Sequence, residues 1–379
     1  MVSGPRQVGK STLLKRTLPK VQYVTLDDPE LRNLARSEPK VFLDLYKPPV
    51  IIDEIQYAPE LFPILKMKVD DDQRPGQYWL SGSQAFEMMK NVTESLAGRV
   101  AILPMLGLST RELLGDVMAE PFLKRLDEFD RPTMDVGELY KTIWRGGFPE
   151  LHAKPDLEPQ RFYADYVQTY LQRDLRDLAN VGDQVGFLKF MRLVAARTGQ
   201  VLNVSEIARA SSIASSTADR WLTVLAASTI ITMLDTAHSS VDGRMVKCRK
   251  LYMTDTGLAA WLAGWNSVEA LMNGAAAGAF LETYAVNEIT KGYLNSGTRP
   301  DLSYFRNKDT KEVDILIVEN GTVYPFEVKS TSRPDLRLAR TLRVAGPLGL
   351  KQGRGGVLCL TPKAFPLGED VAAYPVGLL

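Results

Sequence analysis

The sequence predicts an α/β protein with a parallel sheet in its N-terminal part, followed by a helical region and a small α/β domain. Three observations support this prediction. A glycine-rich loop at residues 4–11 runs into a helix-forming segment, an apolar run at residues 50–52 ends in two acids, and an Asn-Gly turn at residues 320–321 separates two apolar runs. The expected domains are residues 1–115, 116–272 and 273–379.

The composition is that of an ordinary globular protein. The chain has 379 residues, of which 45% are hydrophobic and 24% charged, so each of several domains can bury a core. A formal net charge of +1 argues against a general basic coat for nucleic acid, and any DNA contact must be local. With only 2 cysteines and 2 histidines, the chain does not favour a disulfide framework, a zinc cluster or a histidine-dependent triad. We expect a cytoplasmic protein without membrane segments.

Residues 4–11 match the phosphate-loop pattern. They read Gly-Pro-Arg-Gln-Val-Gly-Lys-Ser, and glycines at these positions let backbone N–H groups close around a polyphosphate. The following helix would point the positive end of its dipole at the phosphates. Lys10 would reach the β- and γ-phosphates of ATP, and Ser11 would hold Mg²⁺. The expected nucleotide-binding residues are Gly4, Pro5, Arg6, Gln7, Val8, Gly9, Lys10, Ser11 and Thr12.

This loop lies unusually close to the first residue of the chain. A phosphate loop normally follows a buried strand of about five or six residues. Only Met1, Val2 and Ser3 precede Gly4. We therefore expect either a truncated chain or a first strand that is a stub, and poor nucleotide affinity if no longer strand exists.

An apolar run followed by two acids completes the expected nucleotide site. Residues 50–52 predict a strand buried on both faces, which would deliver Asp53 and Glu54 beside the phosphate loop. Asp53 would support the Mg²⁺ shell, and Glu54 would act as general base toward water. The alternative is an ordinary strand end. The spacing from Lys10, with room for one intervening strand, favours the site.

Two further polar residues are candidates in this domain. Ser83, or its neighbour Ser81, follows a strand expected at residues 77–80 and would sense the γ-phosphate; the alternative is a plain Ser-Gly turn. Arg99 is a candidate catalytic arginine finger that acts in cis or from a neighbouring subunit. The alternative for Arg99 is a surface arginine or a structural ion pair.

Taken together, these motifs resemble a prokaryotic AAA-like P-loop ATPase family. The N-terminal motifs are residues 4–11, 53–56, 81–83, 96–99 and 111–112. Further motifs resemble the C-terminal region of that family, which is of uncharacterised function. They are residues 146–150, 170–174, 250–258, 312–314 and 327–329. The resemblance covers nearly the whole chain and implies an ATPase that uses ATP and Mg²⁺ and that assembles as a homo-oligomer in some relatives.

The middle of the chain predicts a winged helix. Asn203 or Ser205 would cap one short helix and Ser215-Ser216 a second, at helix-turn-helix spacing. Two β-rich runs at residues 229–234 and 246–253 would form the wing. Basic side chains of the wing would grip the phosphate backbone of DNA, and the alternative is a module that packs between domains or subunits. These side chains are Arg244, Lys247, Arg249 and Lys250.

The last domain predicts the metal-binding constellation of a restriction-endonuclease-like fold. A two-residue turn at Asn320-Gly321 would place Asp314 opposite Glu327 on a hairpin. Lys329 would project from the same face, and Glu282 would come from a neighbouring helix. The three acids would bind Mg²⁺, and the lysine would stabilise the charged transition state of phosphodiester cleavage.

Alternatives remain open for this last domain. Lys329 could form a cross-strand ion pair with Glu312 on a solvated face, and such folds also serve as inactive binding modules. Pro325 lacks a backbone donor, which implies an edge strand or a local irregularity. Strands are expected at residues 302–306, 313–318, 323–329 and 356–360, and a helix at residues 279–291.

These inferences lead to one primary functional expectation. It is Mg²⁺-dependent ATP binding and hydrolysis, coupled to interaction with nucleic acid or to its processing. The first alternative is a nucleotide-gated binding or regulatory protein with an inactive nuclease-like docking domain. The second alternative is a metal-dependent nuclease that needs no ATP.

Overall fold

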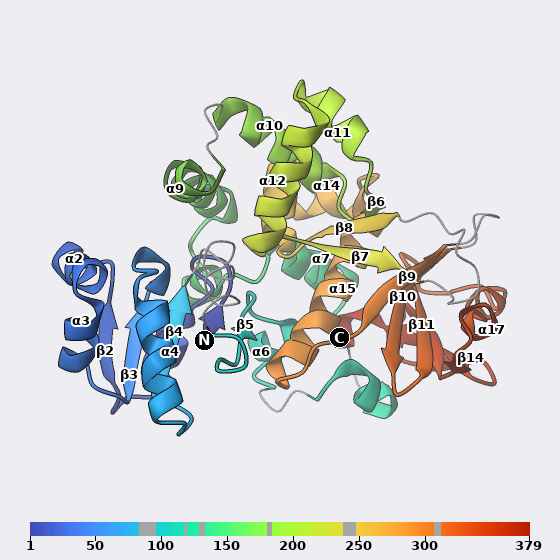
Figure 1. The fold of residues 1–379 in the computed structure, drawn as a ribbon. Coiled ribbons are helices and arrows are strands. Elements are labelled where there is room, and N and C mark those ends of the chain that lie inside the picture. The colour runs from blue at the N-terminus through green and yellow to red at the C-terminus, as the bar shows by residue number, and fades with distance from the viewer. Residues whose placement is uncertain (83–95, 117–119, 129–132, 180–183, 238–247, 307–311) are drawn as a thin grey trace. The chain divides into compact units, whose positions relative to one another are not determined.

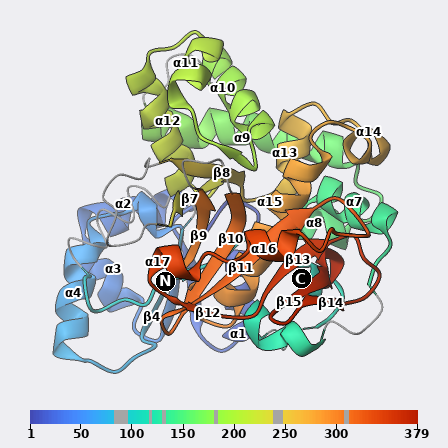
Figure 2. The ribbon, with the colours of Figure 1, turned by 90° about the vertical axis from the view of Figure 1, so that its right-hand side faces the viewer.

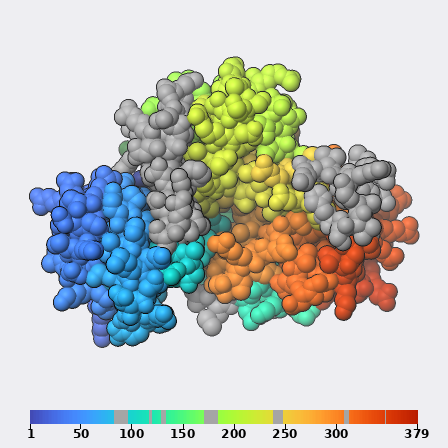
Figure 3. Space-filling view, viewed as in Figure 1, coloured from blue at the N-terminus to red at the C-terminus, as the bar shows by residue number. Residues whose placement is uncertain are grey.

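The computed structural model describes residues 1–82, 96–116, 120–128, 133–179, 184–237, 248–306 and 312–379, shown as a coloured ribbon in Figure 1. The chain forms two compact units. The first unit comprises residues 1–106, 170–180 and 222–230. The second unit comprises residues 107–169, 181–221 and 231–379. The space-filling view shows residues 1–106 mainly in blue and the C-terminal part of the chain in orange and red (Figure 3).

The first unit contains the predicted parallel sheet. Its five strands are ordered β2-β3-β4-β1-β5, and all four strand pairings are parallel. The strands are β1 (Val2–Ser3), β2 (Gln22–Thr25), β3 (Val50–Asp53), β4 (Tyr78–Gly82) and β5 (Leu103–Pro104). The helices are α1 (Lys10–Thr17), α2 (Pro29–Ser37), α3 (Pro39–Leu45), η1 (Ile55–Tyr57) and α4 (Leu61–Asp71). The α/β prediction for this part of the chain is confirmed.

The first strand has two residues and lies inside the sheet. Val2 pairs with Ser81 of β4 and with Leu103 of β5. Gly4 follows at once and approaches the next strand so closely that a Cβ atom there would lie 2.0 Å from the carbonyl oxygen of Met105. The phosphate loop therefore starts at the carboxyl end of a central strand, and only glycine fits at its first position.

The second unit is built on a mixed sheet. Its order is β14-β15-β13-β11-β10-β9-β7-β8-β6, with β12 beside β11, which makes ten strands. Figure 2 shows β9, β10 and β11 side by side. The strands are β6 (Gln200–Val201), β7 (Ile231–Thr236), β8 (Arg249–Met253), β9 (Leu302–Arg306), β10 (Glu312–Glu319), β11 (Thr322–Lys329), β12 (Lys351–Gln352), β13 (Gly355–Cys359), β14 (Phe365–Gly368) and β15 (Val371–Pro375).

The hairpin β10–β11 has the predicted register. Residues pair from Ile315 with Phe326 to Glu319 with Thr322. Asn320 and Gly321 have φ angles of 50° and 73°, the left-handed values that a two-residue type I′ turn requires. The edge position inferred from Pro325 is wrong, because β11 pairs with β10 on one side and with β12 and β13 on the other. The inferred irregularity is present, because Pro325 lies between the β12 and β13 ladders.

The helices that belong wholly or partly to the second unit follow in chain order. They are α6 (Thr110–Leu113), η2 (Phe122–Glu128), α7 (Val136–Arg145), α8 (Pro149–Ala153), α9 (Pro159–Ala179), α10 (Gln184–Ala196), α11 (Val204–Ser211), α12 (Ser215–Ala227), α13 (Thr256–Leu262), α14 (Val268–Met272), α15 (Ala277–Asn295), α16 (Leu338–Thr341), α17 (Ala345–Leu348) and η3 (Val376–Leu378). Helices α9 and α12 extend across the division between the two units.

Residues expected to form a wing join the C-terminal sheet. Asn203 caps α11 by accepting from the backbone N–H of Glu206, and β7 and β8 form an antiparallel pair as expected. Strand β7 also pairs in parallel with β9, with Asp235 beside Ser303. The hairpin is therefore continuous with the sheet of residues 302–375, and its connecting segment, which includes Arg244 and Lys247, lies outside the described residues.

Two of the motifs that carry the family resemblance contact each other. The Asp255 carboxylate accepts hydrogen bonds from the backbone N–H of Gly147 at 2.7 Å and Leu258 at 2.8 Å, and from the Tyr163 hydroxyl at 2.9 Å. A Cβ atom on Gly146 would lie 2.2 Å from that hydroxyl oxygen. Segments 146–150 and 250–258 thus hold one another in place through packing and hydrogen bonds.

Candidate functional site

The phosphate loop follows β1 and ends where α1 begins. Gly9 precedes the helix with φ 98°, and Gln7 has φ 62°, a left-handed conformation that costs a non-glycine residue free energy. Strained backbone of this kind recurs at ligand-binding loops because the surrounding structure enforces it. The loop thus turns the first backbone N–H groups of α1 toward the carboxyl edge of the sheet.

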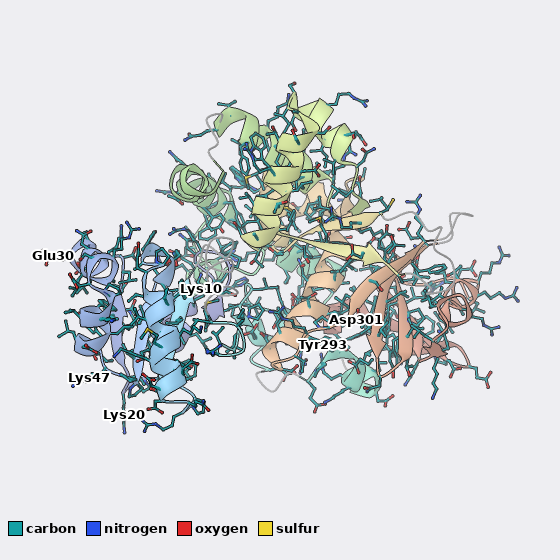
Figure 4. The ribbon with its side chains drawn as sticks, in the orientation of Figure 1. Lys10, Lys20, Glu30, Lys47, Tyr293 and Asp301 are labelled. Atoms are coloured by element: carbon teal, nitrogen blue, oxygen red, sulfur yellow. The ribbon has the colours of Figure 1, made fainter. Side chains whose placement is uncertain are left out.

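Lys10 is buried against its own loop. Its ammonium donates to the carbonyl oxygens of Gly4 at 2.9 Å and Pro5 at 2.6 Å, and its exposed fraction is 6%. Figure 4 shows Lys10 toward the interior of the first unit, whereas Lys20 and Lys47 lie at its surface. The Gly4 and Pro5 carbonyl oxygens thus contact the Lys10 ammonium in the region where the sequence predicts phosphate.

Asp53 lies at the end of β3 and is surrounded by hydroxyl donors. Its carboxylate accepts from the Tyr23 hydroxyl at 2.6 Å and from the Ser81 hydroxyl, and the Ser11 hydroxyl lies near enough to lower its pKa. Burial by itself would raise the pKa of Asp53, but these hydrogen bonds outweigh it and lower the pKa below its usual value. Asp53 is therefore an ionised carboxylate beside the Ser11 hydroxyl, a pair of oxygen ligands that suits Mg²⁺.

Glu54 follows Asp53 in a strained conformation. Its φ is 55°, its side chain is half-buried, and its carboxylate accepts from the side-chain amide of Gln56. The left-handed backbone turns Glu54 away from the strand direction that Asp53 follows. Strain of about 1–3 kcal/mol at a non-glycine residue persists where the surrounding fold enforces it, which occurs often at functional sites.

Of the other candidates of this domain, the structure describes Ser81 and Arg99. Ser83 is outside the described residues, and its neighbour Ser81 is fully buried against Asp53. Arg99 forms an ion pair with Asp70 and lines a cavity of about 570 Å³ together with Tyr78. Tyr78 begins β4, so this cavity lies at the amino end of the strand, whereas the phosphate loop follows the carboxyl end of the parallel strand β1. Arg99 thus forms the ion pair that was its alternative, and action from a neighbouring subunit stays a prediction.

A second buried lysine occupies the acidic centre of the C-terminal sheet. The ammonium of Lys250 lies 2.9 Å from Glu282, 2.6 Å from Glu312 and 3.0 Å from Asp314, measured to carboxylate oxygens. The exposed fraction of Lys250 is 3%. Lys250 therefore cannot contact DNA from a wing, as its sequence position had suggested, because β8 is an inner strand of the sheet and directs this side chain into the interior.

The surroundings of Glu282 and Glu327 disfavour the ionised form of both carboxyl groups. Burial and the charge of Asp314 raise the pKa of Glu282 to about 7 and that of Glu327 to about 7. Lys329 pairs with Glu327 at 2.6 Å, and the alternative of a cross-strand pair between Lys329 and Glu312 is wrong, because Glu312 binds Lys250 instead. One oxygen of Glu327, Oε2, is buried and has no hydrogen-bond partner.

Two of the three expected metal ligands, Glu282 and Asp314, contact the ammonium of Lys250, whereas Glu327 pairs with Lys329. Glu282, Asp314 and Glu327 come from α15, β10 and β11, as predicted. Within the described ranges, no group of three or more His, Cys, Asp or Glu side chains is arranged to hold a metal ion. The cation that joins Glu282 to Asp314 is Lys250.

Sequence reasoning missed two contributors to these sites. Tyr23 reaches Asp53 from the neighbouring strand, and the period-two alternation of β2 would have placed it on one face with Thr25. Lys250 begins a run of apolar residues, Leu251 to Met253, that marks a buried strand. A lysine next to such a run indicates a buried ion pair. The neighbouring sequence does not indicate which acids pair with it.

Comparisons with known proteins assign three segments of the chain. Residues 1–114 match the family model described as AAA domain. The N-terminal segment is an AAA domain. Residues 136–269 match a domain of unknown function (DUF8612), and residues 277–379 match another domain of unknown function (DUF4143). The AAA domain thus contains the phosphate loop and the acid pair, and the acidic centre around Lys250 combines residues of both other domains.

Relatives with similar sequences are themselves uncharacterised. The chain is 28% identical over 378 residues to the uncharacterized proteins Rv2008c of Mycobacterium tuberculosis and Mb2031c of Mycobacterium bovis. The alignment covers 99% of this chain and 79% of each relative. The similarity therefore extends through all three segments.

Solved structures give only weak superpositions. The RuvB Holliday junction branch migration motor of Thermotoga maritima matches 61% of this chain and 80% of its own, with 15% identity and a TM-score of 0.28. Protein VC1899 of Vibrio cholerae matches 96% and 88%, with 12% identity and a TM-score of 0.18. Scores this low support no conclusion about this chain.

A search for membrane-spanning segments gave a negative result for the part of the chain that the structure describes. None of its helices has both the length and the apolar character needed to cross a bilayer.

Proposed function

We propose that the AAA domain binds ATP with Mg²⁺ and hydrolyses it. The observation that carries this proposal is the meeting of the Ser11 hydroxyl with the Asp53 carboxylate at the carboxyl edge of the sheet, next to the loop that contains Lys10. Bound Mg²⁺ would supply a charge that offsets the negative charge of the phosphates. Ser11 and Asp53 would hold it, and the hydrogen bonds from Tyr23 and Ser81 orient Asp53 for this role.

Each remaining residue of the site has a chemical task in this proposal. Lys10 would exchange its two neutral carbonyl partners for phosphate oxygens, which bind an ammonium more strongly. Glu54 would accept a proton from the attacking water, with its carboxylate steadied by Gln56. Ser83 would sense the terminal phosphate. Arg99 would act on the phosphates of a neighbouring subunit in a homo-oligomer.

The proposal is tested by Glu54→Gln, with Glu60→Gln as the matched control. Both changes replace a glutamate by its neutral isostere, and Glu60 is an exposed residue before α4. We expect Glu54→Gln to lower ATP turnover about 10²–10⁴-fold, because a general base contributes this much, and to leave ATP binding within a few-fold of wild type. Equal turnover in the two variants would contradict the role of Glu54.

Coupling to nucleic acid is the second part of the proposal. It is supported by the order of α11, α12 and the β7–β8 hairpin, which follows the winged-helix pattern, and by the exposed side chains of Arg220 and Arg249. We expect duplex DNA to change the rate of ATP hydrolysis. The pair Arg220→Glu and Arg249→Glu should reduce the salt dependence of DNA binding, whereas Arg337→Glu, at another exposed site, should not. If the salt dependence of DNA binding is unchanged in Arg220→Glu and Arg249→Glu, these two residues do not contact DNA.

The position of Lys250 favours a second candidate function for the C-terminal segment. In this candidate the AAA domain is a nucleotide-gated regulator, and the nuclease-like fold only docks a partner. Lys250 fills the centre in which a nuclease would place its metal. The wild-type chain should then leave duplex DNA intact in Mg²⁺ with and without ATP. Cleavage that disappears in Asp314→Asn would contradict this candidate.

A further inference from the structure

The acidic centre around Lys250 contains more carboxylates than cations. Lys250 comes from β8, Glu282 from α15, Glu312 and Asp314 from β10, and Glu327 from β11. With Lys329, two ammonium groups face these four carboxylates, and Arg306 reaches Glu312 only at 3.9 Å. Because charged groups are costly to bury without a partner, the centre depends on the cation at its middle.

The oxygen atoms around Lys250 resemble the ligand set of a divalent cation. Carboxylate oxygens of Glu282, Glu312 and Asp314 lie 2.6–3.0 Å from the Lys250 nitrogen. Mg²⁺ and Ca²⁺ take the same type of ligand at about 2.0–2.6 Å. A contraction of a few tenths of an ångström would therefore convert the cage of an ammonium into that of a metal ion.

Other contacts hold these carboxylates in place independently of Lys250. The Tyr252 hydroxyl donates to Glu282 at 2.6 Å, and the backbone N–H of Val328 donates to Asp314 at 3.0 Å. The acids are thus oriented by the protein as well as by the ammonium. A centre oriented in this way keeps its ligand geometry when its cation is changed.

A separate observation points to unused ligand capacity in the same centre. Glu327 has an exposed fraction of 6%, and its Oε2 atom has no hydrogen-bond partner. Its other oxygen, Oε1, binds Lys329 at 2.6 Å. Glu327 lies opposite Asp314, since their neighbours Phe326 and Ile315 are paired. A buried carboxylate oxygen without a donor is the atom that a bound cation would satisfy.

We propose that the ammonium of Lys250 takes the place of a divalent cation in this centre. The intact chain then binds no divalent cation there, and removal of the Lys250 charge opens a site formed by Glu282, Glu312 and Asp314, the carboxylates that contact the ammonium. This inference goes beyond ATP hydrolysis by the AAA domain and does not depend on it. In this proposal, Lys250 of the segment 136–269 is the cation that the carboxylates of the segment 277–379 require.

The test is Mn²⁺ binding to the full chain without nucleotide, measured by calorimetry and by electron paramagnetic resonance. The variant is Lys250→Met, which keeps the length of the side chain and removes its charge. At about millimolar Mn²⁺, we expect Lys250→Met to bind an additional ion relative to wild type. The double variant Lys250→Met/Asp314→Asn should lose this additional ion.

The matched control is Lys291→Met. Lys291 is also buried and pairs with Glu288 at 2.8 Å, while its ammonium donates to the carbonyl oxygen of Leu108 at 2.9 Å. Only one carboxylate is paired with Lys291 among the described contacts, so its removal should create no Mn²⁺ site. A gain in Lys291→Met equal to that in Lys250→Met would show a general effect of unmasked acids and would overturn the proposal.

Two further results would overturn it. One is a Lys250→Met chain that folds and binds no more Mn²⁺ than wild type. The other is a wild-type chain that already binds Mn²⁺ at a site lost in Asp314→Asn. If Lys250→Met does not fold, the less charged variant Lys250→Met/Glu327→Gln keeps Glu282, Glu312 and Asp314 and is measured in the same way. Failure of both to fold even in Mn²⁺ contradicts the proposal, because the metal should replace the ammonium.

Discussion

Two buried lysines dominate the two regions of this protein that were expected to bind ligands. Lys10 donates to neutral carbonyl oxygens of its own loop, whereas Lys250 lies among three carboxylates from other elements. A carbonyl oxygen holds an ammonium less strongly than a charged oxygen does. Phosphate oxygens can therefore replace the Gly4 and Pro5 carbonyl oxygens at Lys10. The carboxylates around Lys250 need another cation if its ammonium is removed.

The neighbouring tyrosines extend the comparison. Tyr23 donates to Asp53 at 2.6 Å, and Tyr252 donates to Glu282 at 2.6 Å. Hydrogen bonds lower the pKa of Asp53, whereas burial and the charge of Asp314 raise that of Glu282 to about 7. The same donor thus accompanies opposite shifts, because the number of acids nearby decides the result. The ionised Asp53 of the nucleotide site suits Mg²⁺, whereas the acidic centre needs its own internal cation.

The largest expected effect is on stability, in Lys250→Met without metal. Removal of the ammonium leaves buried carboxylates unpaired, which should lower the free energy of unfolding by about 3–5 kcal/mol. ATP turnover by the folded fraction should stay within a few-fold of wild type. Denaturant unfolding at matched ionic strength measures the loss, with the exposed Lys20→Met as control. A loss no larger than that of the control would remove the contrast between the two lysines.

The next effect is on turnover, in Lys10→Met. Loss of the ammonium that faces the phosphates should lower the rate of ATP hydrolysis about 10²–10³-fold. The free energy of unfolding should fall less than in Lys250→Met, because the two carbonyl oxygens that Lys10 contacts, of Gly4 and Pro5, are neutral. Steady-state hydrolysis and denaturant unfolding are measured on one preparation. Comparable destabilisation by Lys10→Met and Lys250→Met would show that the two sites do not differ as described.

A paired tyrosine experiment sharpens the comparison at the level of single hydrogen bonds. Tyr23→Phe should raise the Mg²⁺ concentration for half-maximal ATP turnover about tenfold, because it removes a donor that orients Asp53. Tyr252→Phe should leave that concentration unchanged and lower the free energy of unfolding by about 1.5–3 kcal/mol. A shift of the Mg²⁺ dependence in both variants would argue against separate roles for the two tyrosines.

The smallest expected effect is on the pH dependence of stability, in Glu327→Gln. Burial and Asp314 raise the pKa of Glu327 from 4.5 to about 7, so the folded chain favours the protonated carboxyl. This contribution to stability is fully present below pH 4.5 and is lost as the pH rises through about 7. The Tm of wild type should therefore fall relative to that of Glu327→Gln between about pH 5 and pH 8. A constant difference in Tm would contradict the raised pKa.

Asp53 should show the opposite dependence. Hydrogen bonds lower its pKa in the folded chain, so its contribution to stability is lost as the pH falls through that lowered value. Asp53→Asn should accordingly differ most from wild type at neutral pH and least in acid. Thermal unfolding across the same pH series measures both variants, and identical trends would remove the contrast between the sites.

Local patterns predicted much of the fold. The turn at Asn320-Gly321 set the register of β10 and β11, because a two-residue loop allows only one pairing. The apolar run before Asp53 predicted a strand that the structure confirms as β3. Pro325 shows the limit of such reasoning, because its effect on the ladder depends on which strands lie beside β11, and that is decided by the whole sheet.

The sequence by itself determined the phosphate loop, the acid pair after β3 and the hairpin that carries Asp314, because each depends on residues a few positions apart in the chain. Only the tertiary structure decided that Lys250 meets Glu282 and Asp314, which lie 32 and 64 residues farther along the chain. The physical reason is burial. The free energy of a buried charge depends on the groups that the packed sheet brings near it. Those groups are far apart in the sequence, so no local pattern predicts them.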